Sequence, residues 1–186
     1  MNPLLIDFPE EFETERLLIR MPHPRDGKAV HEAIEASRNE LKPWLPFAQK
    51  EQSAEDVEVN IRNAYIAFMK REDLRLLIYL KETGEFIASS GLHRIDWSIP
   101  KFEIGYWIDS RHSGKGYMTE AVKGITNFAF EELKARRIEI KCDENNIKSR
   151  AVPERLGYNL EGILINDDLS PDTKELRNTC IYSKTI

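Results

Sequence analysis

The chain has 186 residues, of which 41% are hydrophobic and 32% charged. This is enough for one sizeable core and too little for two ordinary domains, so we expect a single domain over residues 1–186. The net charge of −5 argues against a general nucleic-acid binder, and no apolar run is long enough to cross a membrane. The N-terminal segment turns acidic too early for a secretion signal, so we expect a cytoplasmic protein with Cys142 and Cys180 reduced and no metal centre.

The first half of the chain predicts a strand, two helices and a β-hairpin. Ser53 and Asp56 have the spacing of a capping box, which indicates the start of the second helix. Its apolar face comprises Val57, Ile61, Ala64, Tyr65 and Phe68. The predicted elements are a strand at 15–20, a helix from 25 to about 37, this second helix, and hairpin strands at 74–80 and 86–93.

The most informative segment lies at residues 101–129, where a strand passes through a basic, glycine-rich loop into a helix. Apolar residues alternate along the strand and then recur at helical spacing from Met118. Gly114 and Gly116 have no Cβ, so a ligand can approach the loop backbone closely. The free N–H groups of the following helix favour an anion, and Arg111 and Lys115 add positive charge. The segment therefore predicts a phosphate-binding loop, although glycines are also common in ordinary tight turns.

The spacing of the loop excludes two familiar phosphate sites. Lys115 is followed by Gly116, which does not fit G-x-x-x-x-G-K-[ST], and Thr119 stands where G-x-G-x-x-G needs its third glycine. The remaining chain predicts a strand at 138–142, a helix at 146–156, and strands near 158–165 and 178–184.

The loop R-x-x-G-x-G resembles the pyrophosphate-binding loop of the GNAT N-acetyltransferases. Asn146 and Ser149 fit the later N-x-x-S segment of that family, and Arg155-Leu156-Gly157-Tyr158 fits its [KR]-x-G-[FY] segment. The segments TERLLIR at 14–20 and WLPF at 44–47 resemble the RimJ/RimL-like branch, which acetylates the N-termini of ribosomal proteins. The resemblance implies an α/β (α+β) fold, with a mixed, mostly antiparallel sheet, helices on both faces and splayed strands that hold CoA.

The resemblance also implies acetyl-CoA as the cosubstrate. The pantetheine arm would lie where the strand carrying Gly105 splays from its neighbour, and glycine in mid-strand otherwise indicates a bulge. The residues implied in acetyl-CoA binding are Trp107, Ile108, Asp109, Arg111, His112, Ser113, Gly114, Lys115, Gly116, Tyr117, Met118, Asn146 and Ser149.

Acetyl transfer needs a neutral amine. At pH 7 about a tenth of a free α-amino group is neutral, against well under about a thousandth of a lysine side chain, so an N-terminal acceptor needs only a modest base. Glu103 is the first candidate for this base and for substrate contact, because it shares a strand face with Gly105 and Trp107. The alternatives are a solvated Glu103 without a role, water as the base, or His93 or Asp96.

On the leaving-group side, many GNAT enzymes have a tyrosine where this chain has Pro153. Proline also lacks the N–H that would bond the carbonyl of Ser149, so we expect the helix to bend there. The resemblance gives Ser149 the role of donor to the CoA sulfur; the alternative is that it only helps to start the helix. Asn146 likewise has two expected roles. Its residue type favours an N-cap, and the resemblance implies a contact with CoA.

Trp44 lies in a loop that forms one wall of the acceptor cleft in GNAT folds, and it fits either substrate contact or core packing. The resemblance implies direct attack of an amine on acetyl-CoA, with a protein N-terminus as acceptor, a ribosomal protein among the candidates. The alternatives are a small amine (a polyamine, amino acid or antibiotic) as acceptor, or a non-catalytic acyl-CoA-binding module. We expect no membrane or nucleic-acid partner and leave a homodimer open.

Overall fold

The structure is a computed structural model that describes residues 2–186. Its helices are α1 (Gly27–Leu41), α2 (Ala54–Met69), α3 (Tyr117–Glu131) and α4 (Ile147–Arg155). Its strands are β1 (Glu11–Glu13), β2 (Leu17–Arg20), β3 (Leu74–Leu80), β4 (Phe86–Asp96), β5 (Lys101–Ile108), β6 (Arg137–Asp143), β7 (Asn159–Leu169) and β8 (Leu176–Thr185). Within residues 2–186 no helix combines the length and the hydropathy needed to cross a bilayer.

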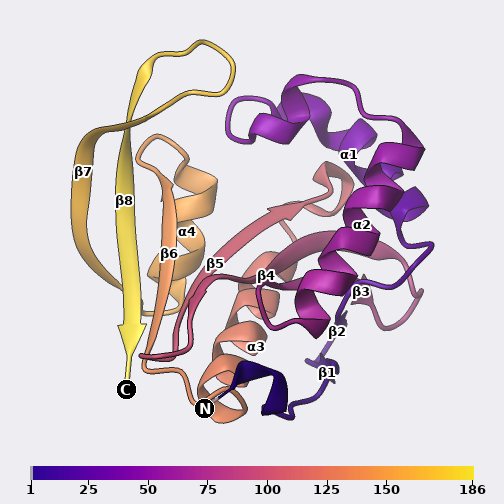
Figure 1. The fold of residues 1–186 in the computed structure, drawn as a ribbon. Coiled ribbons are helices and arrows are strands. Elements are labelled where there is room, and N and C mark those ends of the chain that lie inside the picture. Colours follow the sequence, from indigo (N-terminus) through magenta and orange to yellow (C-terminus); the bar gives the residue numbers. More distant parts are fainter. Residues whose placement is uncertain (1) are drawn as a thin grey trace.

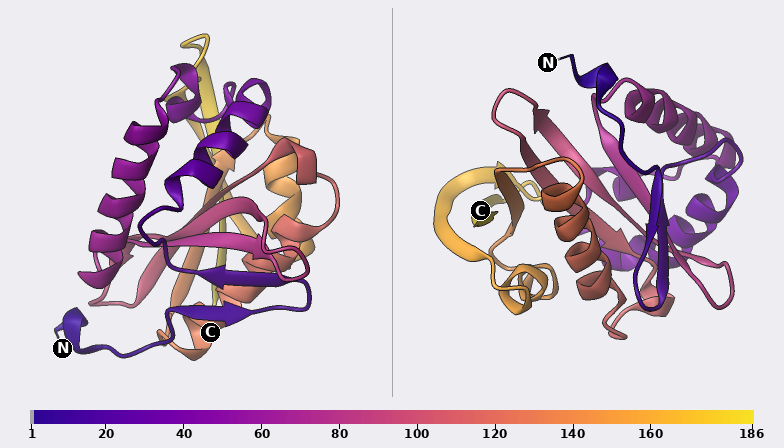
Figure 2. Two further views of the ribbon diagram at one scale, coloured as in Figure 1. Left: turned by 90° about the vertical axis from the view of Figure 1, so that its right-hand side faces the viewer. Right: turned by 90° about the horizontal axis from the view of Figure 1, so that it is seen from below.

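The strands form one mixed sheet in the order β1-β2-β3-β4-β5-β6-β8-β7, in which β5 and β6 are parallel and the other neighbours antiparallel. Helices cover both faces (Figures 1 and 2). The core beneath α1 and α2 contains Val30, Ile34, Val57, Ile61, Leu77, Tyr79 and Phe86. The core beneath α3 contains Leu76, Ile78, Ile104, Val122, Ile125 and Phe128. These features confirm the predicted fold class.

The structure differs from the predicted elements mainly at strand and helix ends. The short strand β1 was not predicted, because two exposed glutamates flank its single apolar residue, Phe12, which pairs with Ile19 of β2. Strand β7 continues to Leu169 rather than ending near residue 165, since its outer part is an exposed ladder held by backbone pairing with β8. Helix α1 likewise extends beyond residue 37 to Leu41.

Helices α1 and α2 are fastened together at their N-terminal halves. The predicted capping box is present: the Asp56 N–H donates to Ser53 Oγ at 3.1 Å and the Ser53 N–H donates to Asp56 Oδ2 at 3.1 Å. Glu58 of α2 then accepts the N–H of Gly27 at 3.0 Å, which satisfies a free donor at the start of α1. A Cβ on Gly27 would lie 2.5 Å from Glu58 Cα, so the close helix contact requires glycine. This pair of helices forms one wall of the cleft described below.

Strands β5 and β6 separate soon after they begin. They pair only at residues 101–103 and 137–139, after which β5 turns away toward α1 and α2 (Figure 1). The expected splay is therefore present, and it leaves the edge of β5 from Ile104 to Ile108 without a strand partner on that side. Helix α4 lies beside β6 and α3 next to this opening.

Candidate active site

The loop between β5 and α3 offers a row of free backbone donors. Gly114 and Gly116 have φ values of 78° and 80°, a left-handed conformation that favours glycine. Within residues 2–186 the N–H groups from Gly114 to Thr119 donate to no protein acceptor. Because these groups lie at the N-terminus of α3, they fit an anion such as a pyrophosphate. The binding of a phosphate by this loop stays a prediction.

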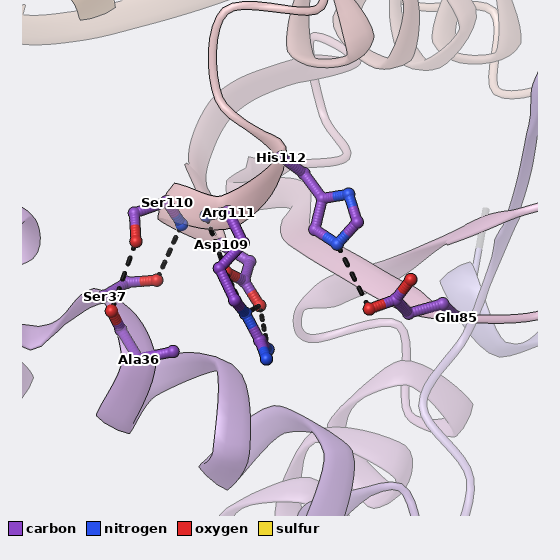
Figure 3. A network of polar contacts seen from close by, with 7 residues as sticks. All are labelled: Ala36, Ser37, Glu85, Asp109, Ser110, Arg111 and His112. Carbon is purple, nitrogen blue, oxygen red and sulfur yellow. Dashed lines mark hydrogen bonds and ion pairs between the residues drawn. The ribbon is translucent and has the colours of Figure 1, made fainter.

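The start of the loop is fixed by Asp109 and Arg111, which Figure 3 shows side by side. The Arg111 Nε donates to Asp109 Oδ1 at 3.0 Å, and the Arg111 N–H donates to the same oxygen at 3.0 Å. Burial raises the pKa of Asp109, but the hydrogen bonds and charge of Arg111 outweigh this and lower it below its usual range. Asp109 is fully buried, so we assign it to holding the loop, whereas Arg111 is exposed and keeps free donors.

Two further contacts in Figure 3 anchor the loop to the rest of the fold. The Ser110 N–H donates to Ser37 Oγ at 2.7 Å, which ties the loop to α1. The buried ring of His112 faces Glu85, with 3.2 Å between His112 Nε2 and Glu85 Oε1. The His112 side chain is therefore turned toward the β3–β4 connection, while Ser113 and Lys115 remain exposed.

Arg16 braces the loop from the other side, a role that the sequence analysis did not identify. Its Nη1 donates to the carbonyl of Lys115 at 3.1 Å, and its Nε donates to Glu120 Oε2 at 2.6 Å. Its guanidinium also lies 4.4 Å from the ring centre of Tyr117. The only sequence signal for Arg16 was that it belongs to the segment TERLLIR, which matches a family motif. Its contacts could not be predicted from that segment, because they join residues about a hundred positions apart. Of the other predicted CoA residues, Met118 is buried in the core and Ile108 packs against it.

Across the opening between β5 and β6, Tyr106 meets the N-terminal turn of α4. The Tyr106 hydroxyl donates to the carbonyl of Ser149 at 2.7 Å, and the Ser149 hydroxyl lies 3.4 Å from it. Burial raises the pKa of Tyr106 above its usual value, so its hydroxyl is a neutral donor. Asn146 Oδ1 accepts the Ser149 N–H at 3.1 Å, which makes Asn146 the N-cap. The Ser149 hydroxyl is thus not the cap and remains beside the opening.

Glu103 lies on the predicted strand face but is engaged by cations. Lys141 Nζ is 3.2 Å from Glu103 Oε2, and Arg94 Nε is 3.4 Å from Glu103 Oε1. Glu103 does not line the cleft, although its neighbours Gly105 and Trp107 do. Asp96, an alternative candidate for the base, accepts the Ser98 N–H at 2.9 Å in the turn between β4 and β5. The role predicted for Glu103 as base stays a prediction.

His93 is a titratable side chain that lines the cleft beside β5. His93 Nδ1 lies 2.7 Å from Asp73 Oδ2, and both side chains line the cleft. A Cβ built on Gly105 would lie 3.5 Å from His93 Cδ2 and 3.9 Å from Nε2, so the far edge of the ring lies over Gly105. If Nδ1 carries the proton donated to Asp73, then Nε2 presents a lone pair to the cleft. In that tautomer the ring has the orientation that a general base requires.

The cleft itself lies between α1, α2 and the sheet and encloses about 570 Å³. Trp107 packs on one side of it, with ring centres 5.9 Å from both Phe47 and Phe86. The loop between α1 and α2 contributes Leu45 and Phe47, as the predicted wall requires. Trp44 of the same loop instead lies 5.3 Å from the guanidinium of Arg177 in β8, so its contact with substrate stays a prediction.

Comparison with known proteins agrees with this geometry. The sequence model described as "Acetyltransferase (GNAT) domain" matches residues 16–159. The "Putative ribosomal N-acetyltransferase YdaF" of Bacillus subtilis (strain 168) is 36% identical over 154 residues, covering 80% of each chain. The ribosomal-protein-serine acetyltransferase of Escherichia coli (strain K12) is 29% identical and covers 86% of this chain and 87% of its own.

Among solved structures, RimL, a ribosomal L7/L12 alpha-N-protein acetyltransferase in complex with coenzyme A, superposes with a TM-score of 0.88. It covers 95% of this chain and 98% of its own at 21% identity, a likeness that shows the fold. The family match and the relatives confirm the predicted enzyme class, with acetyl-CoA as acetyl donor. The chain belongs to the GNAT acetyltransferase family, in the branch that includes the ribosomal-protein acetyltransferases.

Proposed function

We propose that the enzyme acetylates an α-amino group at the N-terminus of a protein or peptide, by direct attack of the amine on acetyl-CoA. The observation that carries this proposal is the His93–Asp73 pair, which lies in an open cleft beside the unpaired edge of β5. The names of two relatives, the ribosomal acetyltransferases of B. subtilis and E. coli, support a ribosomal protein as the physiological acceptor.

The chain provides separate places for the two substrates. The free N–H groups from Gly114 to Thr119 and the exposed Arg111 and Lys115 would hold the pyrophosphate of CoA. The edge of β5 would bind the pantetheine arm through its main-chain groups. When bound, acetyl-CoA supplies the thioester carbonyl that the amine attacks.

We assign the base to His93. As the C–N bond forms, His93 Nε2 takes a proton from the amine, while Asp73 holds the ring through Nδ1 and stabilises the resulting charge. The C–S bond then breaks, and the electron pair goes to the sulfur. The Ser149 hydroxyl, next to Tyr106, would donate a hydrogen bond to that sulfur. A thiol titrates near about 8.5, so little proton delivery is needed at neutral pH.

The function is tested by measuring CoA release with a panel of acceptors: N-terminal peptides, polyamines and aminoglycosides. Mass spectrometry of the product then locates the acetyl group on the α-amine or on a lysine side chain. We expect peptides to be acetylated at the α-amine. Turnover restricted to polyamines or aminoglycosides would assign the enzyme to small amines. CoA binding without turnover on any acceptor would favour a non-catalytic module.

A further inference from the structure

Arg75 of β3 is a half-buried arginine on the wall of the cleft with no acidic partner. Its Nε donates to Ser89 Oγ at 3.1 Å and its Nη1 donates to Asn60 Oδ1 at 2.5 Å. Both partners are neutral, and within residues 2–186 no carboxylate oxygen lies within 4.0 Å of its guanidinium. By contrast, two other half-buried arginines have acidic partners: Arg20 pairs with Asp26 at 2.8 Å and Arg177 pairs with Asp143 at 2.8 Å.

The acid whose charge acts on Arg75 is Asp73, but the two side chains form no direct ion pair. Asp73 lies two residues earlier, on the same face of the chain, and its carboxylate holds His93 Nδ1 at 2.7 Å. Burial lowers the pKa of Arg75, whereas the charge of Asp73 raises it, with burial prevailing. An arginine nevertheless keeps its proton at any physiological pH. The cleft therefore contains a charged guanidinium that is partly removed from water and has no carboxylate bonded to it directly.

Arg75 and His93 both line the cleft, and the guanidinium of Arg75 is held on the side of Ser89 and Asn60. Within residues 2–186 its Nη2 donates to no acceptor. Arg75 pairs with Gly91 in the β3–β4 register, and a Cβ on Gly91 would lie 2.8 Å from both Arg75 Cα and His93 Cε1. Gly91 thus leaves room for the His93 ring, and it lies between His93 and Ser89, the partner of Arg75, along β4. The two N–H groups of Nη2 and the second of Nη1 suit the geometry of a carboxylate.

We propose that Arg75 binds a carboxylate of the acceptor, so that the enzyme prefers amines that carry an acidic group a few bonds away. This inference rests on the proposed function, because it assigns the acceptor's amine to His93 and its acid to Arg75. The acid has two possible sources: the α-carboxylate of a free amino acid, or an acidic side chain near the N-terminus of a peptide. The guanidinium fork recognises both in the same way.

The test uses acceptors matched in shape and different in charge. One pair is a tetrapeptide amide with aspartate in second position and the same peptide with asparagine. The other pair is free alanine and alaninamide. We expect wild-type kcat/KM to favour the acid of one pair by at least about tenfold, the size of one charge-assisted hydrogen bond. The pair that shows the preference identifies the source of the carboxylate.

The variants are Arg75→Gln, which removes the charge, and Arg75→Lys, which keeps it without the fork. Arg75→Gln should bring the acid-to-neutral ratio near unity by slowing only the acidic acceptor, and Arg75→Lys should retain part of the ratio. Arg62→Gln, the same change on the exposed side of α2, is the control and should leave the ratio unchanged. A thermal melting curve shows whether the Arg75→Gln variant folds. If this variant does not fold, the acid-to-neutral ratio of Arg75→Lys is compared with that of the wild type.

Calorimetry of the same acceptors in the presence of CoA measures binding without turnover. A wild-type ratio near unity, or an equal loss with acidic and neutral acceptors in Arg75→Gln, would overturn the inference while leaving the proposed function intact. If no acceptor is acetylated but binding still favours the acid and depends on Arg75, then the proposed function fails and the carboxylate site stands. Without turnover and without selective binding, both fail.

Discussion

The hydroxyl of Tyr106 donates to the carbonyl oxygen of Ser149 at 2.7 Å, and this carbonyl is free because of Pro153. In an unbroken helix the N–H of residue 153 would bond this oxygen, but proline has no N–H. The missing donor is replaced by a hydroxyl from β5, on the other side of the opening. Many GNAT enzymes have a tyrosine at the position of Pro153. In this chain the tyrosine that contacts Ser149 is instead Tyr106 of β5.

The first prediction concerns this replacement. Tyr106→Phe leaves the Ser149 carbonyl without its partner and should lower the free energy of unfolding by about 1–3 kcal/mol. In a Pro153→Ala background the helix regains its own donor, so Tyr106→Phe should cost clearly less. Urea denaturation of the two single variants and the double variant measures this coupling. An equal cost of Tyr106→Phe in both backgrounds would contradict the explanation.

The second prediction separates chemistry from helix capping at α4. Because Asn146 provides the cap, Ser149→Ala should leave stability within about 0.5 kcal/mol of wild type, and Asn146→Ala should cost about 1 kcal/mol. If Ser149 assists the leaving sulfur, Ser149→Ala should lower kcat, most plainly below the thiol pKa of about 8.5, with CoA affinity retained. Steady-state rates and denaturant melts on both variants decide this. Full turnover in Ser149→Ala would end its catalytic assignment.

A third prediction concerns the phosphate-binding loop. Gly116→Val forces a β-branched residue to a φ of 80°, at the place where the anion approaches the backbone. The matched control is Gly157→Val, since Gly157 has a φ of 70° and open space around it. Both variants should lose about 1–2 kcal/mol from backbone strain. CoA should still raise the melting temperature of Gly157→Val but not that of Gly116→Val; a normal shift in both would remove the loop assignment.

The identity of the base gives a fourth prediction. His93→Gln should lower kcat/KM by about 10²–10⁴, and the loss should shrink at high pH, where the amine loses its proton unaided. Asp73→Asn should reduce activity in the same direction, because the ring loses its orienting carboxylate. Glu103→Gln tests the prediction made from the sequence. If Glu103→Gln produces the large, pH-dependent loss and His93→Gln does not, then Glu103 is the base.

The fifth prediction is an acid sensitivity of the β6–β7–β8 unit. Arg137 Nη1 donates to Glu161 Oε1 at 2.7 Å, and this bond, with another from Ser183, lowers the pKa of Glu161 to about 2. A carboxyl with a lowered pKa stabilises the fold above its unfolded pKa of about 4.3, and this contribution is lost as the pH falls toward 2. Glu161→Gln should therefore shift the urea midpoint at pH 6 and have progressively less effect from pH 5 to pH 2. A shift that does not vary with pH would contradict the ion pair.

The sequence by itself determined the elements and the loop that depend on neighbouring residues. The apolar periods of α2 and α3, the capping box at Ser53 and the glycine spacing at Gly114 and Gly116 each lie within one short segment. The local backbone therefore follows from a few consecutive side chains, and the family resemblance rests on the same segments. Strand β1 and the end of β7 were missed, because backbone pairing rather than side-chain pattern defines them.

Only the tertiary structure decided which side chains meet in the cleft and at the opening between β5 and β6. His93 meets Asp73 from twenty positions away and Tyr106 meets Ser149 from forty-three. The register of β3, β4 and β5 sets the first pair, and the splay of β5 from β6 sets the second. A strand register shifted by one residue would turn His93 or Tyr106 to the opposite face of the sheet, and no local pattern records that choice. For the same reason the ion pair of Glu103 with Lys141 depends on how β5 lies beside β6.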